Sequence, residues 1–127
     1  MAVSTKNNRA LRIAGLWLPV AVCMGLIFYA SSKPGSDIPL LFPFQDVLFH
    51  GIIYGTLALL FARAMKKNCP EFVFGELFLV TVLFAGFYGV SDEFHQIFVP
   101  GRDCSTIDLL IDLAGSCLGG LIGGKIF

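Results

Sequence analysis

The chain has 127 residues, of which 56% are hydrophobic and 14% are charged, and its formal net charge is zero. This composition indicates a single integral membrane domain. Because the net charge is zero, electrostatics gives no reason to expect nucleic acid as a partner.

Four apolar segments follow one another along the chain, each close to the ~20 residues that a membrane-spanning helix needs. They cover residues 11–30, 47–64, 72–98 and 107–127. None alternates as a strand would, and backbone groups in lipid must be satisfied within their own segment. We therefore predict an all-α fold, an integral membrane bundle of four transmembrane helices that forms one domain over residues 1–127.

The basic residues predict the orientation of this bundle. Seven lie before or at the start of the first segment, at or after the end of the second, or at the end of the fourth, namely Lys6, Arg9, Arg12, Arg63, Lys66, Lys67 and Lys125. Lys33 and Arg102 lie on the other side. Since cytoplasmic loops carry the excess of lysine and arginine, both termini should be cytoplasmic. Seven of the nine acidic residues then fall in the outer half, where we expect the function to lie.

The first segment follows basic residues, as a signal peptide would, but its apolar stretch is longer, so we expect a retained helix. After it comes the proline-rich stretch 31–44, SSKPGSDIPLLFPF. Prolines stop a helix, yet residues 38–44 are too apolar for a water-exposed loop. This outer loop either enters the membrane interface, folds over the bundle or merely connects two helices.

The second segment carries Asp46, His50 and Tyr54 at intervals of four, which places them on one helix face. Asp46 lies where an N-cap or a first-turn acid is favoured by the helix dipole. A lone membrane histidine is usually a hydrogen-bonded packing residue. Because an acid and a phenol lie one turn to either side, a functional role for His50 is an equal alternative.

The third segment ends in a polar face. On a helix wheel Gly89, Asp92, Glu93 and Gln96 fall within a sector of about 100°, and His95 lies roughly 60° from Asp92. A short Pro-Gly turn leads to the fourth segment, so the two helices should be antiparallel neighbours.

The fourth segment has a single stripe that is acidic at its outer end and glycine-lined further in. Its members are Asp108, Asp112, Gly115, Gly119 and Gly123. Overlapping G-x-x-x-G patterns predict close backbone approach to a neighbouring helix. The acidic ends of this stripe and of the preceding polar face should meet near the same membrane surface.

Three motifs in order resemble the VanZ-like membrane proteins. They are D-x-x-x-H-x-x-x-Y at 46–54, D-E-x-x-Q-x-F-x-P-x-R at 92–102, and Asp108 followed by small residues, with S-S-K-P at 31–34 also fitting. The resemblance implies a small multi-pass protein of the bacterial cytoplasmic membrane, similar to one associated with low-level teicoplanin resistance. This chain departs from the family pattern at Val47, where lysine is common, and at Asp112, where asparagine is common.

These residues support three functional hypotheses. The first is an outward-facing pocket that binds an envelope lipid headgroup, a lipid-linked wall precursor or a lipoglycopeptide, with Arg102 holding an anion or pairing with Asp108. Its candidate ligand-binding residues are Asp46, His50, Tyr54, Asp92, Glu93, His95, Gln96, Arg102, Asp108 and Asp112.

The second hypothesis is a membrane hydrolase or transferase, with His50 or His95 as general base or with a bound divalent metal. The candidate catalytic and metal-binding residues are the same four, His50, Asp92, Glu93 and Asp108. No compact metal motif supports a cofactor. The third hypothesis is an ion or proton pathway, and a purely structural role, in which acid–arginine and acid–histidine bonds fix the helices, is the remaining alternative.

Overall fold

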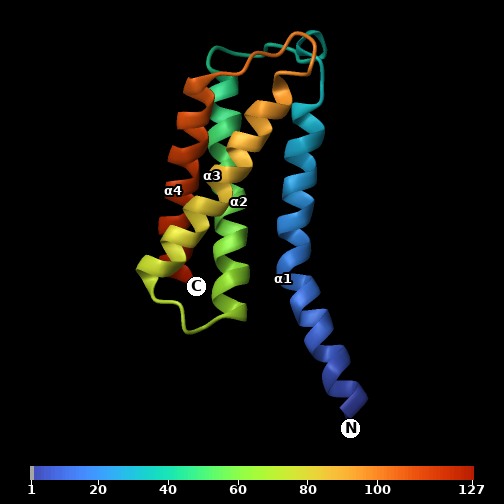
Figure 1. Ribbon diagram of the computed structural model, residues 1–127, viewed down its shortest axis with the longest axis vertical. Helices are drawn as coiled ribbons and strands as arrows, with labels where there is room; N and C mark the ends of the chain where they lie inside the picture. The colour runs from blue at the N-terminus through green and yellow to red at the C-terminus, as the bar shows by residue number, and fades with distance from the viewer. Residues whose placement is uncertain (1) are drawn as a thin grey trace.

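The computed structural model describes residues 2–127, so only the first residue of the predicted domain lies outside the described residues. Four helices follow in order (Figure 1): α1 (Ala2–Ser31), α2 (Gln45–Asn68), α3 (Phe74–Gln96) and α4 (Thr106–Ile126), with a short 3-10 turn, η1 (Gly35–Asp37), after α1. Over residues 2–127 there is no strand, and all four helices are long and apolar enough to cross a membrane. The predicted all-α membrane bundle is therefore confirmed.

The ends of the helices follow local sequence signals. Asp46 lies in the first turn of α2, where the helix dipole favours an acid. The Ser105 side chain caps α4 by accepting a hydrogen bond from the backbone N–H of Asp108 at 3.3 Å. Helix α3 ends four residues before Pro100, and Gly101 turns the chain with a positive φ of 72°.

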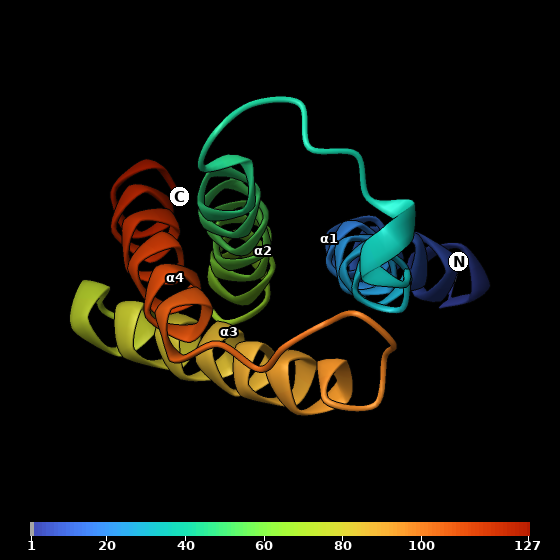
Figure 2. The same cartoon turned by 90° about the horizontal axis from the view of Figure 1, so that it is seen from above.

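Helices α2 and α4 are in direct backbone contact. A Cβ at Gly115 would collide with the carbonyl oxygen of Gly51, and one at Gly119 would collide with that of Gly55. The G-x-x-x-G prediction of close backbone approach is thus confirmed, with α2 as the neighbour. Figure 2 shows α2 and α4 side by side, α3 running across both, and α1 on the opposite side of α2 from α4.

The core lies where α1, α2 and α3 meet. Leu16, Val20 and Ile27 of α1 pack there with Leu57 and Phe61 of α2. Many other large apolar side chains point away from the bundle on every helix, which suits a protein surrounded by lipid. Polar side chains that carry out chemistry are therefore expected in the buried interior of the bundle.

Both termini lie at one end of the bundle, and the connections 32–44 and 97–105 lie at the other, which we call the acidic end (Figure 1). Positive-inside reasoning predicts that the acidic end faces outward, and this orientation stays a prediction. The two connections are bound together, because the Gly35 N–H donates to the Pro100 carbonyl oxygen at 3.0 Å.

The proline-rich loop is also held against α2. The Gln45 side chain donates to the Pro39 carbonyl oxygen at 2.7 Å and accepts from the Leu41 N–H at 2.8 Å. Leu40, Leu41 and Phe44 remain exposed. The loop is thus fixed over the acidic end, with its apolar side chains outward.

Candidate functional site

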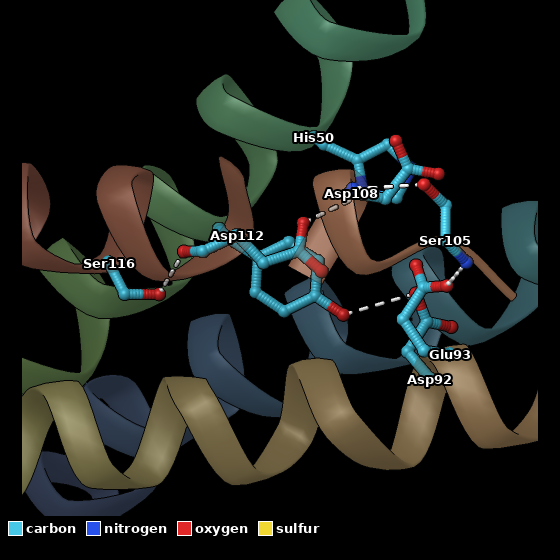
Figure 3. Close-up of polar contacts among 8 residues, drawn as sticks. His50, Asp92, Glu93, Ser105, Asp108, Asp112 and Ser116 are labelled. Atoms are coloured by element: carbon cyan, nitrogen blue, oxygen red, sulfur yellow. Dashed lines mark hydrogen bonds and ion pairs between the residues drawn. The ribbon is translucent and has the colours of Figure 1, made fainter. Parts of the chain in front are cut away.

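Three carboxylates from two helices are buried together near the acidic end. Asp92 and Glu93 come from α3 and Asp112 from α4, and their side chains are 7%, 3% and 0% exposed. Figure 3 shows them facing the same space between the helices, with His50 of α2 beside them. Buried acids in a membrane protein are costly unless they are paired, protonated or bound to a cation, so each of their contacts matters.

His50 is the partner of Asp112. Its Nδ1 lies 2.7 Å from Asp112 Oδ1, a hydrogen bond that becomes an ion pair when the ring is protonated. Gly89 makes room for this contact, because a Cβ there would lie 3.3 Å from Asp112 Oδ2. On the other side, the Ser116 hydroxyl donates to the Asp112 carbonyl oxygen at 2.6 Å. The Ser116 bond reaches the backbone of Asp112, so His50 is the partner of its carboxylate.

Tyr54 is the partner of Asp92. Its hydroxyl donates to Asp92 Oδ2 at 3.1 Å, and the tyrosine is only 1% exposed. The rings of His50 and Tyr54 lie parallel with their centroids 6.4 Å apart. One face of α2 thus supplies a hydrogen-bonding side chain to each of the neighbouring helices α3 and α4.

Glu93 joins α3 to the start of α4. Its Oε2 accepts a hydrogen bond from the Ser105 backbone N–H at 3.0 Å, just before the first turn of α4. Ser105 was not among the predicted site residues. The signal for it was a serine before an apolar run with an acid, Asp108, three residues later, which is typical of a helix N-cap.

A cavity of about 750 Å³ lies between α1 and α2, beside the carboxylates. Along α1 it is lined by apolar side chains that include Val22 and Leu26. At the acidic end its lining becomes polar and includes Lys33, Asp46, His50, Asp92, Gln96 and Arg102. The cavity is therefore amphipathic along the direction in which the helices run.

Two predicted site residues have other contacts than those considered from the sequence. Arg102 does not pair with Asp108, because its Nε and Nη2 donate to the carbonyl oxygens of Lys33 and Ala30 at 3.1 and 2.9 Å. The Ala30 carbonyl belongs to the last turn of α1 and the Lys33 carbonyl to the connection after it, so the guanidinium binds the end of α1. His95 stacks on Phe28 with the ring centroids 4.6 Å apart, so it lies against α1, away from His50.

The remaining candidates lie at the edge of the cluster or in the cavity wall. Asp108 is partly exposed in the first turn of α4, close to His50 (Figure 3). Asp46 is exposed, and Gln96 is buried, and both line the cavity. Asp112, which the sequence placed in the ligand-binding set and not among the metal or catalytic candidates, is the carboxylate that contacts His50.

The sequence matches the model of a known protein family. The family model described as VanZ/LLP1 matches residues 16–124, which reach into all four helices and include every residue of the cluster. The protein belongs to the VanZ-like family. The resemblance seen in the sequence motifs is thereby confirmed. Four residues of those motifs line the cavity between α1 and α2, namely His50, Tyr54, Asp92 and Arg102. Searches among curated proteins and among solved structures gave no significant match.

Proposed function

We propose that this VanZ-like protein binds an anionic envelope lipid in the cavity between α1 and α2. The headgroup lies at the polar, acidic end and the acyl or polyprenyl chain lies along the apolar part. The supporting observation is the amphipathic lining, which changes from Val22 and Leu26 to Lys33 and Arg102 within one cavity. From Pro19 to Ser31 this lining follows α1 for about 18 Å, more than half of the ~30 Å hydrocarbon core.

Lys33 supplies the positive charge for such a headgroup. It lies in the connection after α1, with its Nζ 4.8 Å from the centroid of the Tyr29 ring. The neighbouring Tyr29 side chain raises the pKa of Lys33 above its ordinary value, which favours the protonated amine. Arg102 adds a second cation to the cavity wall while it binds the end of α1. Although Asp46 and Asp92 lie in the same lining, these two cations are the partners that a phosphate-bearing headgroup would take.

In this proposal the protein lies in the bacterial cytoplasmic membrane with its acidic end outward. A lipid-linked wall precursor combines an anionic phosphate headgroup with a long apolar chain, as the cavity requires. Holding such a precursor would limit its capture by a lipoglycopeptide, which is how the protein would contribute to teicoplanin resistance. Cells that express the protein should tolerate more teicoplanin than cells that express a variant with a blocked cavity.

The lipid proposal is tested by native mass spectrometry of the purified protein with phosphatidylglycerol, a polyprenyl phosphate or phosphatidylcholine. We expect retention of the two anionic lipids over phosphatidylcholine, and loss of that preference in Lys33→Gln. Val22→Trp should block the cavity and abolish retention of both. Leu18→Trp is the matched control, because Leu18 is 62% exposed on α1, compared with 51% for Val22, and does not line the cavity.

Two results would refute this proposal. One is retention of phosphatidylcholine as strong as that of the anionic lipids, since it would remove the role of the headgroup charge. The other is equal lipid retention in Val22→Trp and Leu18→Trp, since it would place the lipid outside the cavity. The comparison of phosphatidylglycerol with polyprenyl phosphate then identifies the class of lipid.

A second candidate function is hydrolysis or transfer of the headgroup of a bound lipid. It is favoured by one contact, because His50 lines the cavity while its Nδ1 contacts Asp112. A histidine oriented by a carboxylate at the wall of a substrate cavity can act as a general base. The test is release of phosphate or headgroup from bound lipid by the wild type and by His50→Asn. Equal release from both would exclude His50 as the base.

A further inference from the structure

We infer that His50, Glu93 and Asp112 form a binding site for a divalent transition-metal ion. Each offers one donor atom, a ring nitrogen or a carboxylate oxygen, and these three atoms all lie within 4.8 Å of one another. Metal–ligand distances of about 2.0–2.2 Å bring ligands to within roughly 4.4 Å of each other. Small movements of these side chains would therefore bring the three donor atoms to metal-binding distance.

Two buried oxygens of the cluster lack a hydrogen-bond partner. They are Glu93 Oε1 and Asp112 Oδ2, and they belong to side chains that are 3% and 0% exposed. A buried carboxylate oxygen without a partner carries its full desolvation cost, which protein structures rarely accept. A bound ion would satisfy both oxygens at once. This observation is independent of the clustering, and it points to a ligand between the two acids.

The charges of the cluster also favour a cation. Over residues 4–127 the one ion pair is that between His50 and Asp112, while Arg102 is bound to backbone carbonyls. Glu93 has the Ser105 N–H as its partner and no cationic side chain. A divalent ion would offset the two negative charges of Glu93 and Asp112 beside a neutral His50, which lowers the cost of placing these two acids in the membrane.

The donor set identifies the class of ion. One imidazole and two carboxylates suit Zn²⁺, Mn²⁺ or Fe²⁺, whereas Ca²⁺ and Mg²⁺ prefer oxygen donors alone. Three protein ligands leave at least one coordination position for another group, as in catalytic sites. Of the three ligands, His50 also lines the cavity between α1 and α2. The ion would bind without any lipid, so this inference goes beyond the proposed lipid function.

The experiment uses the full chain without a polyhistidine tag, purified in detergent, stripped with a chelator and titrated with Mn²⁺. Electron paramagnetic resonance should show one saturable Mn²⁺ site that Zn²⁺ displaces, with a coupling to one imidazole nitrogen. The chain has two histidines, which gives a matched pair. His50→Gln should lose the nitrogen coupling, and His95→Gln, whose ring lies against Phe28, should keep it.

The two carboxylates have their own variants. Glu93→Gln and Asp112→Asn should each weaken Mn²⁺ binding at least about tenfold. Asp103→Asn, at an exposed acid of the α3–α4 connection, should bind as the wild type does. Helix content by circular dichroism confirms that each variant folds. If Glu93→Gln aggregates, Glu93→Asp replaces it, because it keeps the charge but shortens the reach of the ligand.

A wild-type protein that shows no saturable Mn²⁺ or Zn²⁺ binding overturns the inference, whatever the variants do. A nitrogen coupling that survives in His50→Gln, or equal affinity in Glu93→Gln and Asp103→Asn, also overturns it. Val22→Trp should keep full Mn²⁺ affinity, so failure of lipid binding and failure of metal binding are separate results.

Discussion

The hydrogen bond between Tyr54 and Asp92 gives the sharpest prediction about stability. Tyr54→Phe removes one buried hydroxyl, which lies 3.1 Å from Asp92 Oδ2, and leaves the aromatic ring in place. A hydrogen bond to a charged group is worth about 1.5–3 kcal/mol in water-soluble proteins, and the strongest side-chain bonds measured between membrane helices reach about 1.7 kcal/mol. We therefore expect Tyr54→Phe to lower the free energy of unfolding by about 1–2 kcal/mol.

The other two tyrosines of the chain supply the controls. The Tyr88 hydroxyl donates to the neutral Met24 carbonyl oxygen at 2.6 Å and is half-buried, so Tyr88→Phe should cost about 0.5–1 kcal/mol. Tyr29 is exposed, and Tyr29→Phe should change stability by less than about 0.5 kcal/mol. The expected order of destabilisation is Tyr54, then Tyr88, then Tyr29.

Reversible unfolding in mixed micelles with increasing dodecyl sulfate measures this order. The single tryptophan, Trp17, packs edge-on against Phe61 with ring centroids 5.7 Å apart, so its fluorescence reports the contact between α1 and α2. Circular dichroism follows the helices themselves. If Tyr54→Phe lowers the free energy of unfolding no more than Tyr29→Phe does, the Tyr54 hydroxyl does not stabilise the buried Asp92.

Three further predictions concern the helix contacts. Gly119→Ala should destabilise the protein by about 1–3 kcal/mol, because the added methyl group meets the Gly55 carbonyl oxygen. Gly25→Ala is the control and should be neutral or stabilising, because Gly25 has open space around it. Equal melting temperatures of the two variants would contradict the close contact of α2 and α4. Ser105→Ala should cost about 1 kcal/mol by removing the cap of α4, and unchanged hydrogen exchange in the first turn of that helix would argue against it. Arg102→Gln should raise hydrogen exchange at the end of α1, and identical exchange in both proteins would show that the guanidinium does not cap the helix.

The membrane bundle was predictable because hydropathy and helical period are local properties. Each apolar segment is long enough to span the hydrocarbon core, and in lipid a helix is the only way for such a segment to satisfy its own backbone. The glycines of α4 likewise predict a close contact from their spacing alone. That α2 is the neighbour, through Gly51 and Gly55, depended on how the helices pack.

The residues of the site were largely visible in the sequence, but their pairing was not. Helix-wheel reasoning places Asp92 and Glu93 on one face and His50 and Tyr54 on another, because both facts follow from the period of a single helix. It does not give the depth or rotation of one helix relative to the next. For this reason the sequence could offer Arg102 as a partner for Asp108, whereas in the fold its guanidinium binds the carbonyls at the end of α1.

The amino-acid sequence by itself determined the class of protein, the four helices, the family and the end of the bundle that carries the acids, since composition, period and motif order decide these. Only the tertiary structure decided that Asp112 contacts His50, that Tyr54 contacts Asp92, and that one oxygen of Glu93 is buried without a partner. The physical reason is that such contacts extend over a few ångströms between separate helices. A rotation of α2 by a single residue, about 100°, would break both of these hydrogen bonds.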